Sequence, residues 1–226
     1  MSSSTLELPP DLKSRQKASY DAIARIYNDW TDQHNPLRLR FLDQLCTVCP
    51  QLLDSSQTPA LLELGCGRGT PTLDTMLARN SGLSVVANDM SEIQIGHAKE
   101  NLAAYADRAK CIAGDMTKLE FPDDSFTAVI ALYTFLHLPR EEQVEMFRKI
   151  AQWLKPGGYL LCNFANEEIA GRVNDKWLHE EGWMYESGYG AEESARKLEE
   201  AGFEVEHQSA EGDEMETFVW FIVKKK

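Results

Sequence analysis

Residues 61–69 read Leu61-Leu62-Glu63-Leu64-Gly65-Cys66-Gly67-Arg68-Gly69. They indicate a short apolar strand that runs directly into a glycine-rich turn, and Thr70 and Pro71 then open the next helix. Glycines at such a turn let backbone N–H groups approach a ligand that side chains would otherwise block. The stretch therefore predicts a ligand-binding turn after the first strand of an α/β sheet.

Two details separate this turn from the fingerprint of nicotinamide- and flavin-binding folds, which is the alternative interpretation. That fingerprint places its third glycine three residues after the second, but here Thr70 stands at that position and Gly69 comes one residue earlier. Glu63 lies two residues before the first glycine, where a carboxylate cannot help to bind a pyrophosphate but can order a cationic ligand. The ExGxGxG pattern resembles motif I of the class I S-adenosylmethionine-dependent methyltransferases.

That resemblance implies S-adenosyl-L-methionine as the cofactor and S-adenosyl-L-homocysteine as its product. It also implies that Glu63, Gly65, Cys66 and Gly67 belong to the cofactor-binding site. Cys66 stands where the turn needs a small apolar residue.

The composition is typical of a globular enzyme, with 43% hydrophobic and 26% charged residues in 226. This length suits a single domain with a full core. No apolar run approaches the roughly 20 residues needed to span a bilayer, so we expect no membrane partner. The net charge of −13 repels phosphate backbones, which argues against a nucleic-acid partner. The sequence carries no signal for the oligomeric state.

Five cysteines and a Ser-rich start, Met1–Pro10, without a basic and apolar leader indicate reduced thiols and a cytoplasmic location. Cys46 and Cys49 form a lone CxxC, and no second pair follows to complete a zinc site. We therefore expect no metal. Both cysteines share an apolar helical pattern with Leu42 and Leu45, which predicts packing in the core.

The rest of the chain alternates short apolar strands with helices. Strands are expected at Ala60–Leu64, Ser84–Asp89, Ala109–Ala113, Thr127–Leu132 and Tyr159–Phe164, and helices at Pro71–Arg79, Glu92–Tyr105 and Arg140–Leu154. Such alternation indicates a parallel sheet covered on both faces. A helix at Ala191–Ala201 precedes two strands, Phe203–Gln208 and Glu216–Val223, whose short acidic connection Ala210–Met215 allows only antiparallel pairing.

This order of elements is similar to the class I methyltransferase fold over Ala60 to Val223. The resemblance implies an α/β, Rossmann-like, seven-stranded and mostly parallel sheet in the order 3-2-1-4-5-7-6, with helices on both faces and a C-terminal antiparallel hairpin. We expect one methyltransferase domain. Its parts are an N-terminal helical cap (residues 1–50), a cofactor-binding core (60–165), a lid-like insertion (166–190), and a helix with the hairpin (191–226).

Two of the expected strands end in a carboxylate, at the sheet edge where open α/β folds bind ligands. Asp89 ends the second strand and is expected to accept hydrogen bonds from ribose hydroxyls, with Met90 on the adenine face. Asp115 follows the third strand, and by the resemblance it reads the adenine amino group, with the backbone of Met116 at a ring nitrogen. The structural alternatives are a helix cap for Asp89 and a turn-forming role for Asp115.

Residues 126–138, FTAVIALYTFLHL, resemble the family's motif IV, where the chain passes beneath the transferred methyl group. Leu132 is expected at the cofactor and Tyr133 at the methyl acceptor. The Asn- or Asp-Pro-Pro-aromatic element of amino-methylating nucleic-acid enzymes is missing here, which counts against that chemistry. Residues 154–158, LKPGG, resemble the turn before the family's fifth strand, and their role is structural.

The N-terminal region predicts two amphipathic helices, the second beginning at Pro36. In the first, Tyr20, Ile23, Tyr27 and Trp30 recur at three- and four-residue steps. Such a helix closes over the cofactor in small-molecule members of the family. By that resemblance Tyr20 reaches the cofactor, while Tyr27 and Trp30 contact the acceptor. Packing in the core is the alternative for both tyrosines.

The insertion at 166–190 is polar and glycine-punctuated, yet it carries Trp177, Trp183 and Tyr185. This mixture favours a lid that excludes water and contacts the acceptor, with a small core of its own as the alternative. His137 and His179 are candidate bases, and His137 is the predicted catalytic residue. A base is needed only where the acceptor is a hydroxyl of high pKa, and a structural histidine is the alternative.

These features predict a methyltransferase that moves a methyl group from S-adenosylmethionine to an O, N or S atom of a small-molecule metabolite by in-line displacement. The sequence does not identify the acceptor. One alternative is a protein methyltransferase, which needs an open groove rather than a lid. Another is a cofactor-binding regulator that does not methylate and docks a partner through its acidic C-terminal third.

Overall fold

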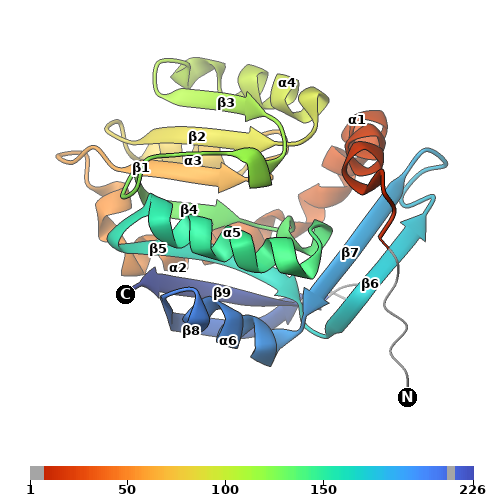
Figure 1. The fold of residues 1–226 in the computed structure, drawn as a ribbon. Coiled ribbons are helices and arrows are strands. Elements are labelled where there is room, and N and C mark those ends of the chain that lie inside the picture. The colour runs from red at the N-terminus through yellow and green to blue at the C-terminus, as the bar shows by residue number, and fades with distance from the viewer. Residues whose placement is uncertain (1–7, 213–216) are drawn as a thin grey trace.

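The computed structural model of the chain describes residues 8–212 and 217–226 (Figure 1). The expected N-terminal segment Met1–Pro10 and the acidic turn Ala210–Met215 lie partly outside these ranges, and so does the expected first residue of the last strand, Glu216. Within them, the central sheet has seven strands in the order β3-β2-β1-β4-β5-β9-β8. Since β8 and β9 are the sixth and seventh strands of this sheet, the predicted order 3-2-1-4-5-7-6 is confirmed.

The first four strands of the sheet run in parallel, so their carboxyl ends meet at one edge. Their bounds are β1 (Ala60–Leu64), β2 (Ser84–Asp89), β3 (Ala109–Ala113) and β4 (Phe126–Ala131). β5 (Leu154–Ala165) pairs in parallel with β4 and antiparallel with β9 (Thr217–Lys225), which pairs antiparallel with β8 (Phe203–Gly212). The mostly parallel sheet therefore closes with the expected C-terminal hairpin.

Helices cover both faces of this sheet because successive side chains of a strand point to opposite faces. Leu61 packs in a cluster with α2 (Asn35–Val48), α3 (Thr72–Arg79) and α4 (Glu92–Asn101). Leu62, its neighbour, packs in a second cluster with α5 (Arg140–Trp153) and α6 (Ala191–Glu200). Short 3-10 helices lie between the elements: η1 (Asp32–His34), η2 (Pro50–Leu53), η3 (Ala103–Tyr105), η4 (Met116–Lys118) and η5 (Phe135–His137).

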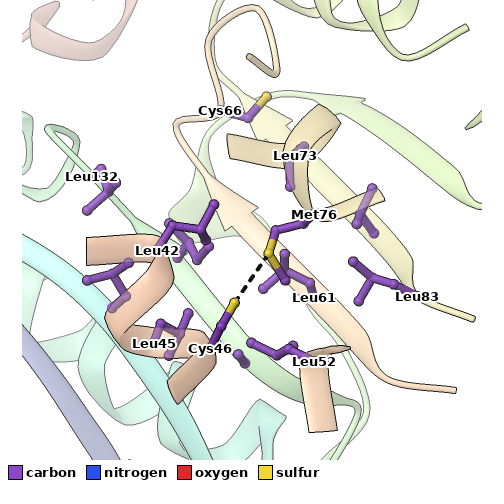
Figure 2. Packing of buried hydrophobic residues seen from close by; sticks show 14 of the residues in the cluster. Leu42, Leu45, Cys46, Leu52, Leu61, Cys66, Leu73, Met76, Leu83 and Leu132 are labelled. Atoms are coloured by element: carbon purple, nitrogen blue, oxygen red, sulfur yellow. Dashed lines mark hydrogen bonds between the residues drawn. The ribbon is translucent and has the colours of Figure 1, made fainter. Parts of the chain in front are cut away.

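The CxxC cysteines belong to the first cluster, as Figure 2 shows for Cys46. The Sγ of Cys46 lies 3.7 Å from the Sδ of Met76 on α3. Cys49 is 1% exposed, and burial raises its pKa to about 11. The predicted packing of both cysteines in the core is confirmed.

The boundary between α5 and β5 differs from the expected one. The strand begins at Leu154, five residues before the expected start at Tyr159, because Leu154 pairs with Phe126 on β4 across an irregularity in the register. The LKPGG residues therefore belong to β5, where they form an irregular bulge between the pairs Phe126–Leu154 and Ala128–Tyr159. Gly157 adopts a φ of 72° within them, a conformation that favours glycine.

The segment after β5 folds into a separate two-stranded hairpin of β6 (Glu168–Asp175) and β7 (Trp183–Tyr189). Neither strand was expected from the sequence. The exposure of β6 alternates along the strand, whereas β7 is buried at almost every position. The first helix, α1 (Leu12–Thr31), lies beside β7 (Figure 1). Both elements stand at the carboxyl edge of the central sheet, so they form a cap over it.

Candidate active site

A cavity lies between α1 and the carboxyl ends of the parallel strands. The predicted cofactor residues that line it are Tyr20, Gly65, Gly67, Asp89, Met90, Asp115 and Met116. The predicted acceptor and catalytic residues that line it are Tyr27, Tyr133 and His137. Predicted site residues that lie far apart in the sequence, from Tyr20 to His137, thus line one cavity.

The glycine turn after β1 forms the floor of this cavity. Gly65 has a φ of 67° and Gly67 a φ of 52°, which side chains rarely tolerate. A Cβ atom on Gly65 would lie 2.3 Å from the Oγ1 of Thr134, so the turn and the segment after β4 approach each other too closely for any side chain. The sequence motif therefore reflects a real steric requirement at Gly65.

Asp89 at the end of β2 binds the turn directly. Its carboxylate accepts hydrogen bonds from the backbone N–H of Gly67 at 2.9 Å and from that of Ser91 at 2.8 Å. Desolvation raises the pKa of Asp89 to about 6, although these two hydrogen bonds act against the shift. Asp89 thus accepts a hydrogen bond at the start of α4 and also lines the cavity. A role as a helix cap and a role in binding a ligand therefore do not exclude each other.

Asp115 after β3 also lines the cavity, and it is hydrogen-bonded to α1 of the cap. Lys13 on α1 donates to Asp115 Oδ2 at 2.8 Å, and the backbone N–H of Thr117 donates to Oδ1 at 2.9 Å. Burial acts to raise the pKa of Asp115, but the hydrogen bonds from Lys13 and Thr117 outweigh it and hold the pKa below its ordinary value. Asp115 is therefore ionised at neutral pH.

Glu63, Cys66 and Leu132 line a smaller cavity beyond Gly65, together with Arg38 from α2. Glu63 is 5% exposed, and its Oε2 has no hydrogen-bond partner among the described residues. Burial raises the pKa of Glu63 to about 8, while the charge of Arg38 acts to lower it. Burial also raises the pKa of the Cys66 thiol well above its usual value. Glu63 is thus a buried acid available to a cationic group.

His137 in η5 and Tyr20 on α1 form a hydrogen-bonded pair beside Thr134. The hydroxyl of Tyr20 lies 2.8 Å from the Nε2 of His137, and the Nδ1 of His137 lies 2.9 Å from the backbone carbonyl of Tyr185. A carbonyl only accepts, so Nδ1 carries the proton, and the Tyr20 hydroxyl donates to the lone pair of Nε2. Desolvation lowers the pKa of His137 to about 4, which keeps the imidazole neutral at pH 7.

Aromatic rings continue from this pair across the cap. Trp177 lies 5.8 Å from Tyr20, 5.8 Å from Tyr27 and 5.6 Å from Trp30, measured between ring centroids. All four rings are partly exposed. Trp30 and Trp177 do not line the main cavity but extend the aromatic surface outward from it. This set of four is called the aromatic patch below.

Tyr133 forms another wall of the cavity in an unusual backbone conformation. Its φ is 55°, rare for a residue with a side chain. The N–H of Tyr133 donates to Asn163 Oδ1 at 2.6 Å, and Asn163 is fully buried on β5. Residues held in such conformations cluster at functional sites. The conformation of Tyr133 therefore indicates a functional site after β4, independently of the glycine turn.

Two residues of the insertion that were predicted to contact the methyl acceptor, Trp183 and Tyr185, do not line the cavity. Trp183 and Tyr185 are 3% and 1% exposed and form a small core with Leu12 beneath α1. Tyr185 faces the site only through its backbone carbonyl. His179, the other candidate base, is exposed and lies 3.8 Å from Glu181.

The cavity also contains residues that the sequence did not single out: Leu12, Lys13, Gln16, Gln94, Gly114, Thr134 and Leu138. The sequence pattern could have identified two of them, Lys13 and Gln16. They share one face of α1 with Tyr20 and Tyr27, at steps of three, four and seven residues. The amide oxygens of Gln16 and Gln94 are buried and have no hydrogen-bond partner among the described residues. Both are available to a ligand.

Within residues 8–212 and 217–226, no group of three or more His, Cys, Asp and Glu side chains is arranged to hold a metal ion. In the same part of the chain, no helix has the length and apolar character needed to cross a membrane.

Comparison with known proteins agrees with the methyltransferase resemblance of the sequence motifs. Residues 61–158 match a protein family described as a methyltransferase domain. The chain is 29% identical over 180 residues to methyltransferase GfsG of Streptomyces halstedii, covering 69% of this chain and 63% of the relative. It is 30% identical over 148 residues to a carboxy-S-adenosyl-L-methionine synthase of Shewanella loihica, covering 63% and 58%. The chain thus spans less than two thirds of the length of both relatives.

Among solved structures, the chain is similar to 1,6-didemethyltoxoflavin-N1-methyltransferase of Burkholderia thailandensis, crystallised with 1,6-didemethyltoxoflavin and S-adenosylhomocysteine. The TM-score is 0.74, and the match covers 100% of this chain and 93% of that one. The sequence identity is 16%, so the similarity concerns the fold.

Proposed function

Because this chain belongs to the class I S-adenosylmethionine-dependent methyltransferase family, whose members are enzymes that use S-adenosylmethionine, we propose that it methylates a small molecule. The acceptor atom is O, N or S. The observation that carries the proposal is one cavity that joins a glycine turn, two strand-end carboxylates and the Tyr20–His137 pair. S-adenosylmethionine supplies a methyl group on an activated sulfonium leaving group, so alignment supplies most of the acceleration.

The sheet side of the cavity fits the cofactor. Gly65 leaves the turn without a side chain where a Cβ atom would meet Thr134, and Asp89 offers a carboxylate beside that turn. Asp89 is the residue that would bind the ribose hydroxyls, and Met90 would contact the adenine. Asp115, with the backbone of Met116, would read the adenine edge.

The smaller cavity fits the amino-acid end of the cofactor. Glu63 presents a buried oxygen without a hydrogen-bond partner among the described residues, and an ammonium group is a suitable partner for it. Arg38 lines the same space and would bind a carboxylate, which guanidinium groups bind well. Cys66 and Leu132 would enclose the ligand without reacting.

The Tyr20–His137 pair can remove a proton from the acceptor. With Nδ1 protonated against the Tyr185 carbonyl, Nε2 accepts the Tyr20 proton as Tyr20 takes one from the acceptor. The acceptor atom forms the new bond to the methyl carbon as the carbon–sulfur bond breaks, and the proton ends on His137 Nε2. A hydroxyl acceptor depends on this step most, because it has the highest pKa of the three.

The acceptor would bind along the aromatic patch and Tyr133. The cavity is lined by tyrosine, threonine and leucine besides its charged residues, Lys13, Asp89 and Asp115. The two carboxylates are the groups proposed above for the cofactor. Rings of this kind bind flat or apolar molecules through their faces. Trp183 and Tyr185 would support the acceptor site from beneath through the small core they form with Leu12.

The setting of the enzyme is part of the same proposal. All five cysteines are free thiols, which supports a cytoplasmic location. The acidic composition, with 36 acidic against 23 basic residues, supports a small-molecule partner over a nucleic acid.

The test is to incubate the protein with S-adenosylmethionine that carries an isotopically labelled methyl group and a metabolite extract. A labelled small molecule that forms only with the active protein is the expected result, and mass spectrometry identifies the acceptor atom. Label in the protein fraction of a whole-cell extract alone would favour a protein methyltransferase. No labelled product together with cofactor binding would favour a regulator or another reaction on the cofactor.

A further inference from the structure

One edge of β7 meets the active site instead of another strand. The hairpin has two strands, and among the described residues no third strand pairs with β7. Backbone groups of alternate residues point to the same edge of a strand, here those of Trp183, Tyr185 and Ser187. These residues are 3%, 1% and 0% exposed, so their N–H and C=O groups need partners from other elements.

The first two partners come from the elements that carry the proposed acid–base pair. The Oγ of Ser19 on α1 accepts a hydrogen bond from the N–H of Trp183 at 2.6 Å, and Ser19 directly precedes Tyr20. The Nδ1 of His137 donates to the carbonyl of Tyr185 at 2.9 Å. Tyr20 and His137 are therefore aligned against the same strand edge, two residues apart.

A buried cross-link holds the third position. The Nε2 of Gln143 on α5 donates to the carbonyls of Ser187 and Leu138, both at 3.0 Å. The Oγ of Ser187 also donates to the carbonyl of Leu138 at 2.7 Å, and Leu138 directly follows His137. Gln143 is 0% exposed. The Tyr185 carbonyl and the His137 ring are thus both held within two residues of one cross-link.

We propose that the edge of β7 is the template that aligns Tyr20 with His137, and that Ser19, Gln143 and Ser187 are positioning residues for the pair. This proposal rests on the proposed function, since that function assigns proton removal to Tyr20 and His137. The hairpin sets which nitrogen of His137 is protonated, through the Tyr185 carbonyl. Ser19, by binding the N–H of Trp183, sets the distance from the Tyr20 hydroxyl to the unprotonated Nε2 of His137.

The tautomer of His137 tests this directly in the full-length protein with ¹⁵N-labelled histidine. The wild-type NMR spectrum should show His137, assigned by its loss in His137→Asn, with Nδ1 protonated and Nε2 bare. Gln143→Met, which keeps the volume but removes the donor, should give shifts averaged between the two tautomers. This measurement needs no substrate.

Ser19→Ala gives a second, milder variant. It should lower kcat about three- to tenfold, the effect of one hydrogen bond, while affinity for S-adenosylhomocysteine changes less than twofold. Ser19→Thr keeps the hydroxyl and should restore kcat. Ser194→Ala is the matched control, because Ser194 is a 1% exposed serine on α6 whose hydroxyl has no hydrogen-bond partner among the described residues.

The outcomes separate this inference from the proposed function. A pure Nδ1-protonated tautomer in Gln143→Met, with the kcat of Ser19→Ala equal to that of Ser194→Ala, overturns the template role. A wild-type protein that transfers no methyl group overturns the proposed function, and the tautomer measurement then still decides whether the strand edge orients His137.

Discussion

The sheet side of the cavity takes its residues from the ends of neighbouring parallel strands, whereas the cap side joins α1, η5 and β7 from distant parts of the chain. On the sheet side, the cavity is lined by backbone of unusual conformation at Gly65 and by a carboxylate at Asp89. On the cap side, a tyrosine, a histidine and a strand carbonyl form one hydrogen-bonded chain. We therefore propose that the two sides serve different tasks.

Under this proposal, the sheet side determines cofactor binding and the cap side determines turnover. Substitutions on the sheet side should change cofactor affinity, because its groups are the ones proposed to bind the ribose, the adenine and the amino-acid end. Substitutions on the cap side should change the rate at saturating cofactor, because its groups are the ones proposed to bind the acceptor and remove its proton. A change that moves both quantities equally would show that the two sides are not separate.

The largest effect is expected for His137→Asn. General base catalysis contributes roughly 10²–10⁴-fold, so kcat should fall by about that factor while S-adenosylhomocysteine affinity stays within about twofold. The pKa of His137 is lowered to about 4 by desolvation, so the wild-type rate should not titrate with a histidine between pH 6 and 8. A kcat within threefold of wild type would remove His137 from the proton path.

Two tryptophans of the insertion should behave in opposite ways. Trp183 is 3% exposed, with the guanidinium of Arg15 4.5 Å from its ring centroid, so Trp183→Ala should cost about 3–5 kcal/mol in the free energy of unfolding. Trp177 belongs to the partly exposed aromatic patch, so Trp177→Ala should raise KM for the acceptor with little loss of stability. Denaturant titrations of both variants check this, and the reverse ranking would contradict the placement.

Asp89→Ala probes the sheet side. Loss of a charged acceptor costs roughly 1.5–3 kcal/mol, so cofactor affinity should fall about ten- to a hundredfold, with kcat at saturation unchanged. Because the carboxylate also binds Gly67 and Ser91, the free energy of unfolding should fall as well. Calorimetric titration of the folded fraction separates the two effects, and an unaltered affinity would leave Asp89 as a helix cap alone.

The smallest effect is a proton linked to cofactor binding. Burial raises the pKa of Glu63 to about 8, so Glu63 is protonated at pH 7 and should release that proton when an ammonium group binds beside it. Affinity for S-adenosylhomocysteine should then rise by up to about tenfold from pH 6.5 to 7.5. Glu63→Gln should flatten this dependence, and calorimetry in buffers of different ionisation enthalpy counts the proton.

The same raised pKa gives a stability test with a fixed sign. The unfolded chain loses the Glu63 proton near pH 4.5 and the folded chain near pH 8. The folded state therefore binds more protons between those values, and the Glu63 contribution to the free energy of unfolding falls as pH rises. Glu63→Gln should remove that fall. An unchanged pH dependence in the variant would place the titration elsewhere.

Local sequence predicted the sheet side well because each of its groups sits in a short contiguous motif. The glycine turn, Asp89 and Asp115 each follow an apolar strand directly, and parallel strands bring their carboxyl ends together without further information. The strands β1, β2 and β3 begin and end at the expected residues for the same reason.

The cap side could not be derived in this way, because its contacts join residues far apart in sequence. Ser19 meets Trp183 across 164 positions, and Ser187 meets Leu138 across 49. A buried serine or glutamine looks like a solvated polar residue until its partner is known. The burial of β7 was hidden for the same reason, since its polar residues Glu186 and Ser187 are buried only because other elements cover them.

Calorimetric titration with S-adenosylhomocysteine, and with NAD as the matched control, tests the cofactor site most directly. The residues of the sheet side predict binding of micromolar order, about −8 kcal/mol, and no measurable binding of NAD. Tight binding of NAD without binding of S-adenosylhomocysteine would contradict the methyltransferase function and would return the glycine turn to the dinucleotide-binding interpretation.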